Sequence, residues 1–249
     1  MRAASELPIP NMFLASLAAD DFEALRPHFE MVRLTSRLIL HEMGAPIEHC
    51  YFTDGGMVSL LLALEEGALI EAGLVGKEGF AGAPALMGFE DSSPFTSMVQ
   101  MPGVGLRIPP AVLRTEMLRR SSLLDQVHRF TQALNLQISH TAACNAHHNL
   151  MERLARWLLM AHDRADSDAL PLTQEFVSMM LGVRRPGVTV AARSLQAIGA
   201  IDYERGRITV RDRHRLEEAS CECYGIVRDQ YRRVLGWPSR LESEQLVRK

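Results

Sequence analysis

Arginine and threonine side chains recur near the end of the chain at the spacing of one helical face. Arg185, Thr189 and Arg193 are four residues apart, and Arg184 stands directly before them. Residues four apart lie on the same side of a helix. A guanidinium offers a rigid fork of donors that fits phosphate oxygens and the O6/N7 edge of guanine, and helix N-termini favour anions. This chemistry indicates a helix that binds in the major groove of DNA.

The flanking residues predict the elements that must position this face. Thr173 is the candidate N-cap of a short helix whose buried side holds Phe176, Val177, Met180 and Leu181. Gly182 ends that helix, and Pro186 suits the first turn of a second one, the recognition helix, at about residues 185–198. Ile201–Tyr203 and Arg207–Val210 have the pattern of two strands joined by a tight turn, which would form a wing.

This order of elements is typical of a winged helix-turn-helix. The alternative is a small helical hairpin with a solvated, arginine-rich face. We favour DNA binding because helix, glycine turn, helix and wing occur together. The side chains expected to contact DNA are Thr173, Arg184, Arg185, Thr189, Arg193, Arg205 and Arg207.

Charge is divided unevenly along the 249 residues. Residues 170–249 hold 14 Lys and Arg against 10 Asp and Glu, a net charge of +4, whereas the remainder has a net charge of −7. The positive charge therefore lies where the DNA-binding elements are expected. The longest apolar run, Met57–Leu64, is too short to span a bilayer, and the N-terminus lacks the apolar core of a signal peptide. We expect a cytoplasmic protein.

The rest of the chain changes character at Pro110. Between residues 29 and 109, short apolar runs separated by glycines predict a closed antiparallel β-structure. From Pro110 no glycine occurs until Gly182, and helices are expected. In a long helix capped by Ser121 or Ser122, an apolar stripe recurs at spacings of three and four. It would pack against a second copy of the helix or against the chain's own β-domain. The stripe comprises Leu123, Val127, Phe130, Leu134, Ile138 and Thr141.

The C-terminal segment resembles the DNA-binding domain of the Crp/Fnr family of bacterial transcription regulators. The residues that carry the resemblance are Leu172, Thr173, Gly182, Arg185, Val188, Leu195 and Ile201. The resemblance extends over the chain and implies an α+β fold. It would have a cupin-like antiparallel β-roll sensor at 1–120, a dimerisation helix at 121–148 and a winged helix-turn-helix domain at 149–249. It implies a homodimer on a palindromic operator in double-stranded DNA, an effector of unknown identity and RNA polymerase as a candidate partner.

Two departures from the family pattern affect what the chain should bind. Well-studied relatives have Glu and Arg where Pro186 and Val190 stand here, so the preferred operator should differ. Family members that bind a cyclic nucleotide use a glycine-rich turn, an acid for the ribose and an Arg for the phosphate. Lys77, Glu78 and Gly79 are the candidate ligand contacts, but residues 90–98 contain no basic residue. A buried phosphate would be unpaired, so we expect no cyclic AMP binding.

Histidines and cysteines supply the remaining candidate chemistry. His140, Cys144, His147 and His148 lie on or near one helical face, and Cys221 and Cys223 would point to different faces of a later helix, Arg213–Leu235. No Cys precedes Cys50, which excludes the N-terminal iron–sulfur cluster of the family's Fnr branch. We expect reduced thiols and no metal or cofactor. The alternatives are a metal- or haem-sensing regulator and a cupin-type metal enzyme, but no H-x-H pair or catalytic triad supports an enzyme.

Overall fold

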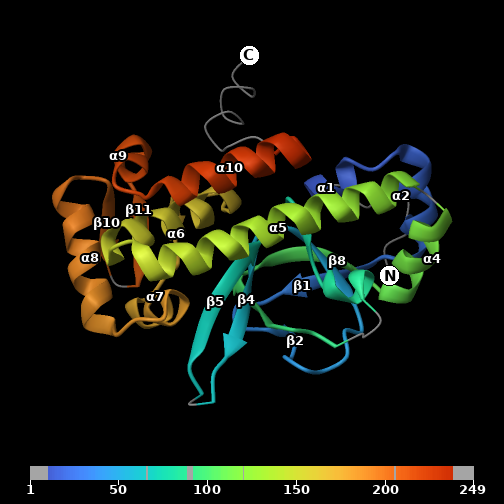
Figure 1. The fold of residues 1–249 in the computed structure, drawn as a ribbon, viewed down its shortest axis with the longest axis horizontal. Helices are drawn as coiled ribbons and strands as arrows, with labels where there is room; N and C mark the ends of the chain where they lie inside the picture. The colour runs from blue at the N-terminus through green and yellow to red at the C-terminus, as the bar shows by residue number, and fades with distance from the viewer. Residues whose placement is uncertain (1–10, 66, 89–91, 120, 205, 238–249) are drawn as a thin grey trace. The chain divides into compact units, whose positions relative to one another are not determined.

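The computed structural model describes residues 11–237 except 66, 89–91, 120 and 205 (Figure 1). The chain divides into two compact units. The N-terminal unit comprises Met1–Leu60 and Val75–Gln132, and the C-terminal unit comprises Leu61–Leu74 and Ala133–Lys249. The three divisions therefore fall within two strands and within the long helix. The three-domain boundaries expected from the sequence stay a prediction.

Two four-stranded sheets give the first half of the chain its architecture. One sheet has the order β1 (Glu30–Leu34), β8 (Gly103–Ile108), β3 (Cys50–Asp54), β6 (Phe80–Ala81). The other has the order β2 (Ile39–His41), β7 (Thr96–Met101), β4 (Met57–Ala63), β5 (Leu69–Val75). The registers known in both sheets are antiparallel. The expected antiparallel β-structure, and with it the α+β fold class, is confirmed.

Aromatic packing builds the core of the N-terminal unit. Its helical segments are α1 (Met12–Ala15), α2 (Ala19–Leu25), a 3-10 turn at Arg26–His28, α3 (Pro84–Met87), α4 (Pro110–Arg119) and the first part of α5 (Ser121–His147). The ring of Phe80 lies 4.8 Å from that of Phe52 and 5.1 Å from those of Phe13 and Phe130. A Cβ at Gly79 would lie 1.9 Å from the Phe130 ring, so only glycine lets α5 approach this turn so closely.

The apolar stripe of α5 is largely used within the chain itself. Leu123, Val127 and Phe130 are buried in the N-terminal unit. In the C-terminal unit, Leu134 and Ile138 approach Gly73 of β5, and the Gln137 side chain pairs with both backbone groups of Leu74. Most of the stripe therefore packs within the chain itself, and the packing of this helix against a second copy stays a prediction.

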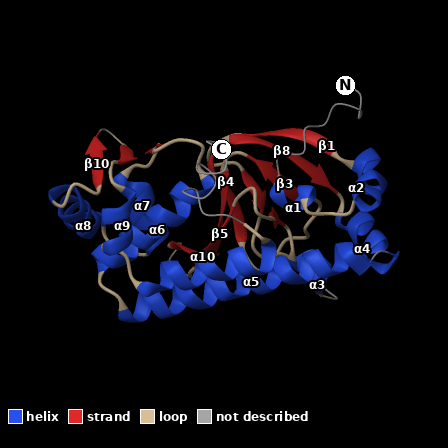
Figure 2. Cartoon of the chain, turned by 90° about the horizontal axis from the view of Figure 1, so that it is seen from above, coloured by secondary structure: helices blue, strands red, loops and turns tan. Residues whose placement is uncertain are grey.

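The C-terminal unit is mainly helical. Its elements after α5 are α6 (Leu150–Arg164), β9 (Ala169–Leu170), α7 (Gln174–Leu181), α8 (Arg185–Ala197), β10 (Ile201–Glu204), β11 (Arg207–Val210), α9 (Arg213–Glu218) and α10 (Glu222–Leu235) (Figure 2). A reciprocal capping box between Asn149 and Glu152 starts α6. The three strands form one antiparallel sheet in the order β10-β11-β9.

One sequence prediction is wrong here. The segment Arg213–Leu235 is two helices, because the chain leaves helical geometry at Ala219–Cys221. Cys221 has extended backbone angles and stands before α10 as its N-cap. Because Cys221 lies outside the helix, the expectation that Cys221 and Cys223 point to different faces of one helix does not apply.

A buried ion pair joins α9 to α6 in this unit. Arg213 lies 2.7 Å from Asp163, and its guanidinium also meets His162 at 2.9 Å. Burial by itself would lower the pKa of Arg213, but the Asp163 carboxylate outweighs it and raises that pKa. The pair therefore fixes the start of α9 to the end of α6. Within the described residues, no helix is long and apolar enough to cross a membrane.

Candidate nucleic-acid interface

The first helix of the motif begins and ends as its sequence predicts. The Thr173 hydroxyl accepts a hydrogen bond from the Phe176 backbone N–H at 3.1 Å and so caps α7. Gly182 ends the helix in the left-handed conformation, with φ 62°. A Cβ makes that conformation sterically unfavourable, whereas glycine adopts it without strain. The sharp turn between α7 and α8 therefore depends on this residue.

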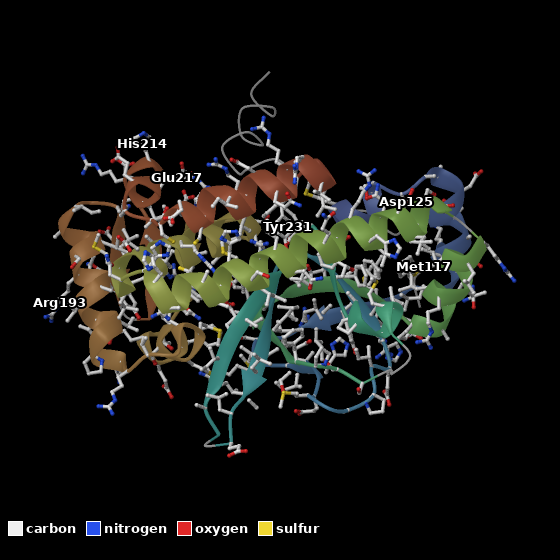
Figure 3. The ribbon with its side chains drawn as sticks, viewed as in Figure 1. Met117, Asp125, Arg193, His214, Glu217 and Tyr231 are labelled. Carbon is white, nitrogen blue, oxygen red and sulfur yellow. The ribbon has the colours of Figure 1, made fainter. Side chains whose placement is uncertain are left out.

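The second helix buries one face and exposes the opposite one. Val188, Ala191, Ala192 and Leu195 lie in the core, and Pro186 stands in the first turn. Arg184, Arg185 and Arg193 are exposed. Figure 3 shows Arg193 at the outer side of α8, pointing away from the ribbon. Arg184 at the N-cap, and Arg185 and Arg193 on the helix, thus lie outside the core.

A side chain that sequence reasoning missed links the two helices. Gln174, the first residue of α7, accepts hydrogen bonds through its Oε1 from Arg185 Nε at 3.3 Å and from the Thr189 hydroxyl at 3.1 Å. Thr189 also donates to the carbonyl of Arg185. Gln174 therefore orients two of the predicted DNA contacts. A polar residue next to a helix cap was the only signal in the sequence.

The wing lies beside the start of α7. A Cβ at Gly206 would lie 3.3 Å from Cγ2 of Thr173, so the wing turn and the α7 cap are neighbours. Arg207 is exposed on β11, whereas Arg205 lies outside the described residues. Arg211 pairs with Asp202 across the wing at 2.5 Å. The structure therefore brings Thr173, Arg185 and Thr189 together through α7 and leaves Arg207 on the adjacent wing.

The candidate ligand contacts of the N-terminal unit are largely turned inward. Glu78 is buried, and its Oε1 accepts a hydrogen bond from the Gly76 backbone N–H at 3.1 Å. The carbonyl of Gly79 accepts a hydrogen bond from the Asn11 side-chain amide, and the Lys77 carbonyl accepts one from the Met12 backbone. The turn is thus closed by α1 on one side and by Phe130 on the other. Ligand binding at Lys77, Glu78 and Gly79 stays a prediction.

The histidines and cysteines assort differently from the sequence prediction. Cys144, His148, Cys221 and Cys223 come together, with their ligand atoms within 4.8 Å of one another. His140 and His147, expected on the same face, are not part of this group. A hydrogen bond between the thiols of Cys144 and Cys221 raises the pKa of Cys144 and lowers the pKa of Cys221. These four residue types could hold a metal ion.

Comparison with known proteins identifies the helix-turn-helix and the fold around it. Residues 152–219 match the family model of the Crp-like helix-turn-helix domain. No curated protein matches the chain.

Solved structures match most of the chain. FixK2 from Bradyrhizobium japonicum is 16% identical, with a TM-score of 0.67 over 78% of this chain and 98% of its own. A putative Crp/Fnr-family regulator from Eubacterium rectale is 17% identical, with a TM-score of 0.65 over 82% of this chain and 95% of its own. A CRP-family regulator from Thermus thermophilus is 20% identical, with a TM-score of 0.63 over 76% of this chain and 96% of its own. The resemblance drawn from the sequence is confirmed: the chain carries a Crp-like helix-turn-helix domain within the fold of the Crp/Fnr family of transcription regulators.

Proposed function

We propose that the protein regulates transcription by binding double-stranded DNA with α8 in the major groove. The observation that carries this proposal is the exposed face of α8, where Arg185 and Arg193 stand over a fully packed apolar side. Arg185 reads a guanine, and Arg184 and Arg193 contact phosphates or base edges. Thr173 and the wing residue Arg207 contact the backbone on either side.

Because this chain has Val190 where well-studied relatives have an arginine, its operator should differ from theirs at the base pair that this residue contacts. Its side chain is 66% exposed on α8, although it is apolar. An exposed apolar side chain on a recognition helix fits the methyl group of thymine. We therefore propose that Val190 and the neighbouring Pro186 select a thymine-containing step next to the guanine read by Arg185.

A homodimer is the form in which this chain would bind a palindromic operator in the cytoplasm. Because most of the apolar stripe of α5 is buried within the chain itself, the dimer would use the opposite face of the helix. Asn135, Ser139, Ala142 and Ala146 are exposed there at spacings of three and four. Small side chains of this kind let two helix backbones approach closely.

An input at the N-terminal unit would reach α5 through the turn at residues 76–79. Phe130 of α5 fills the space over Gly79, so movement of the turn displaces this ring. Regulation would then be a population shift between two placements of the recognition helices. RNA polymerase is the partner expected for an activator of this kind.

Selection of bound DNA from a random pool, with and without cell extract, tests the proposal. We expect an enriched palindrome with half-sites about 10 base pairs apart, and dependence on extract would reveal an effector. Binding that falls steeply with salt but enriches no sequence would contradict a specific regulator.

A further inference from the structure

Four side chains from two distant segments converge in the C-terminal unit. Cys144 lies in the last turn of α5 and His148 directly follows that helix. Cys221 is the N-cap of α10, and Cys223 lies in its first turn. Cys144 Sγ is 3.5 Å from Cys221 Sγ, and Cys223 Sγ is 3.9 Å from His148 Nδ1. All four candidate ligand atoms lie within 4.8 Å of one another, and the three thiols are buried.

We propose that Cys144, His148, Cys221 and Cys223 bind one zinc ion in a tetrahedral Cys3His site. The three thiolate ligands and one imidazole match the composition of closed structural zinc sites. This site was not expected from the sequence, and it is separate from the DNA-binding face of α8.

The observed spacing is close to what zinc requires. Thiolate sulfur at about 2.3 Å and imidazole nitrogen at about 2.0–2.1 Å from the ion place tetrahedral ligand atoms roughly 3.5–3.8 Å apart. The Cys144–Cys221 and Cys223–His148 pairs, at 3.5 and 3.9 Å, already fall near this range. The remaining pairs of ligand atoms lie within 4.8 Å, and small rotations of the side chains would bring them to the distances that zinc requires.

The surroundings of His148 also fit a metal ligand. Its Nδ1 faces Cys223, while its Nε2 lies 3.1 Å from Glu222 Oε2. A carboxylate on the far nitrogen holds the proton there and leaves the near nitrogen free to bind the ion. Glu222 would thus fix the tautomer and the ring orientation of His148.

A buried arginine balances the charge of such a site. Three thiolates and one zinc ion carry a net charge of −1. The Arg156 side chain is buried and donates to the Thr141 hydroxyl and to the Met160 sulfur. In the described part of the chain it forms no ion pair with a carboxylate. Arg156 and Cys144 line the same small cavity, so the positive charge of the guanidinium lies beside the proposed site.

The ion would join the end of α5 to the start of α10. Four protein ligands leave no open coordination position, so the role is structural. The site would hold α10 beside α6 and α5 together with the hydrogen bond from Gln137 to Tyr231, a residue that Figure 3 labels on α10. Loss of zinc would release the N-terminal end of α10, a helix that packs against α6.

Metal analysis of the full-length chain, purified without a histidine tag, tests the proposal. We expect about one zinc per chain in the wild type, and loss of most of it in Cys221→Ser and Cys144→Ser. Cys50→Ser removes a buried thiol outside the cluster, and His147→Gln removes the adjacent histidine. Both controls should retain the zinc. Equal zinc loss in the controls would overturn the assignment.

A second measurement keeps the test decisive if the serine variants do not fold. Wild-type protein is stripped with a chelator under reducing conditions and titrated with Co²⁺. The expected result is a visible spectrum of tetrahedral, thiolate-bound cobalt with an end point of about one ion per chain, followed by a rise in melting temperature with Zn²⁺.

Three outcomes would overturn the zinc site. The first is wild-type protein that binds neither ion and whose melting temperature is unaffected by Zn²⁺ or chelator. The second is a metal-free protein in which Cys144 and Cys221 form a disulfide even when purified with reductant. The third is a brown preparation that contains iron and labile sulfide, which would show an iron–sulfur cluster in place of zinc.

Discussion

Arg185 stands at the point where the recognition helix begins, and its surroundings restrain it. Its Nε donates a hydrogen bond to Gln174 Oε1. Burial raises the pKa of the Tyr203 phenol, and the nearby charge of Arg185 partly opposes that rise. A side chain held this way loses less freedom when it binds a base. The orientation of Arg185 therefore depends on α7 as much as on α8.

Replacing Arg185 by Ala should weaken binding to the selected operator by about 1–3 kcal/mol and relax the preference at one base pair. The loss arises because a bidentate contact to guanine has no substitute. Titration of labelled operator and scrambled DNA measures both effects. Arg33→Ala, which removes an exposed arginine of β1, is the charge-matched control and should bind as the wild type does. An unchanged operator affinity in the Arg185 variant would contradict base reading.

His41 is a buried base in the N-terminal unit. Burial lowers its pKa, an effect only partly opposed by its hydrogen bond to the His49 carbonyl at 2.8 Å. As pH falls below about 6.5, the ring is protonated first in the unfolded chain, so stability declines. The contribution is complete above that pH and is lost during acidification.

His41→Gln should reduce this loss, because glutamine can still donate to the His49 carbonyl but does not titrate. Urea unfolding at pH 7.5 and 5.5 compares the two proteins, and we expect the smaller decrease for the variant. Equal decreases would show that other groups govern the acid response.

At the level of helices and strands, the unusual backbone conformations and close contacts lie at turns and helix ends. Gly182 closes α7 in a left-handed conformation, Cys221 precedes α10 in an extended one, and Gly79 admits the Phe130 ring. Each is a place where one backbone or one missing Cβ decides how two helices or a helix and a turn meet. These positions should therefore be the least tolerant of substitution.

Gly79→Ala should destabilise the protein by about 1–3 kcal/mol, because its Cβ would overlap the Phe130 ring and force α5 away from the turn. Thermal and urea unfolding measure the change. Gly225→Ala in α10 is the matched control. A Cβ there meets nothing within 4 Å, and alanine should stabilise the helix by about 0.5–1 kcal/mol. Similar stabilities for the two variants would exclude close packing at residue 79.

For the whole molecule, the decisive property is the number of chains that bind one operator. The long helix has its apolar side covered by the same chain, and it leaves a face of small and polar residues at 135, 139, 142 and 146. Two-fold symmetry of this face would place two copies of α8 on one side of the duplex.

Ala142→Arg should disrupt that contact, because it places two bulky charges at the symmetry axis. Light scattering should then give the mass of one chain, 27.8 kDa, where the wild type gives twice that mass. Affinity for the full palindrome should fall to that of a half-site. Thr115→Arg, on an exposed position of α4, is the control and should stay dimeric. A dimeric Ala142 variant would place the interface elsewhere.

The sequence by itself determined the local elements of the DNA-binding domain and the fold class. Thr173, Gly182 and Pro186 specify helix ends through their own hydrogen bonds and backbone preferences, so the motif was predictable from short windows. Only the tertiary structure decided which distant side chains meet. The pairing of the α5 stripe with β5, the contact of Gln174 with Arg185, and the convergence of Cys144 with Cys221 join residues from separate elements. Such contacts depend on how helices pack and where a helix breaks, which sequence periodicity does not encode.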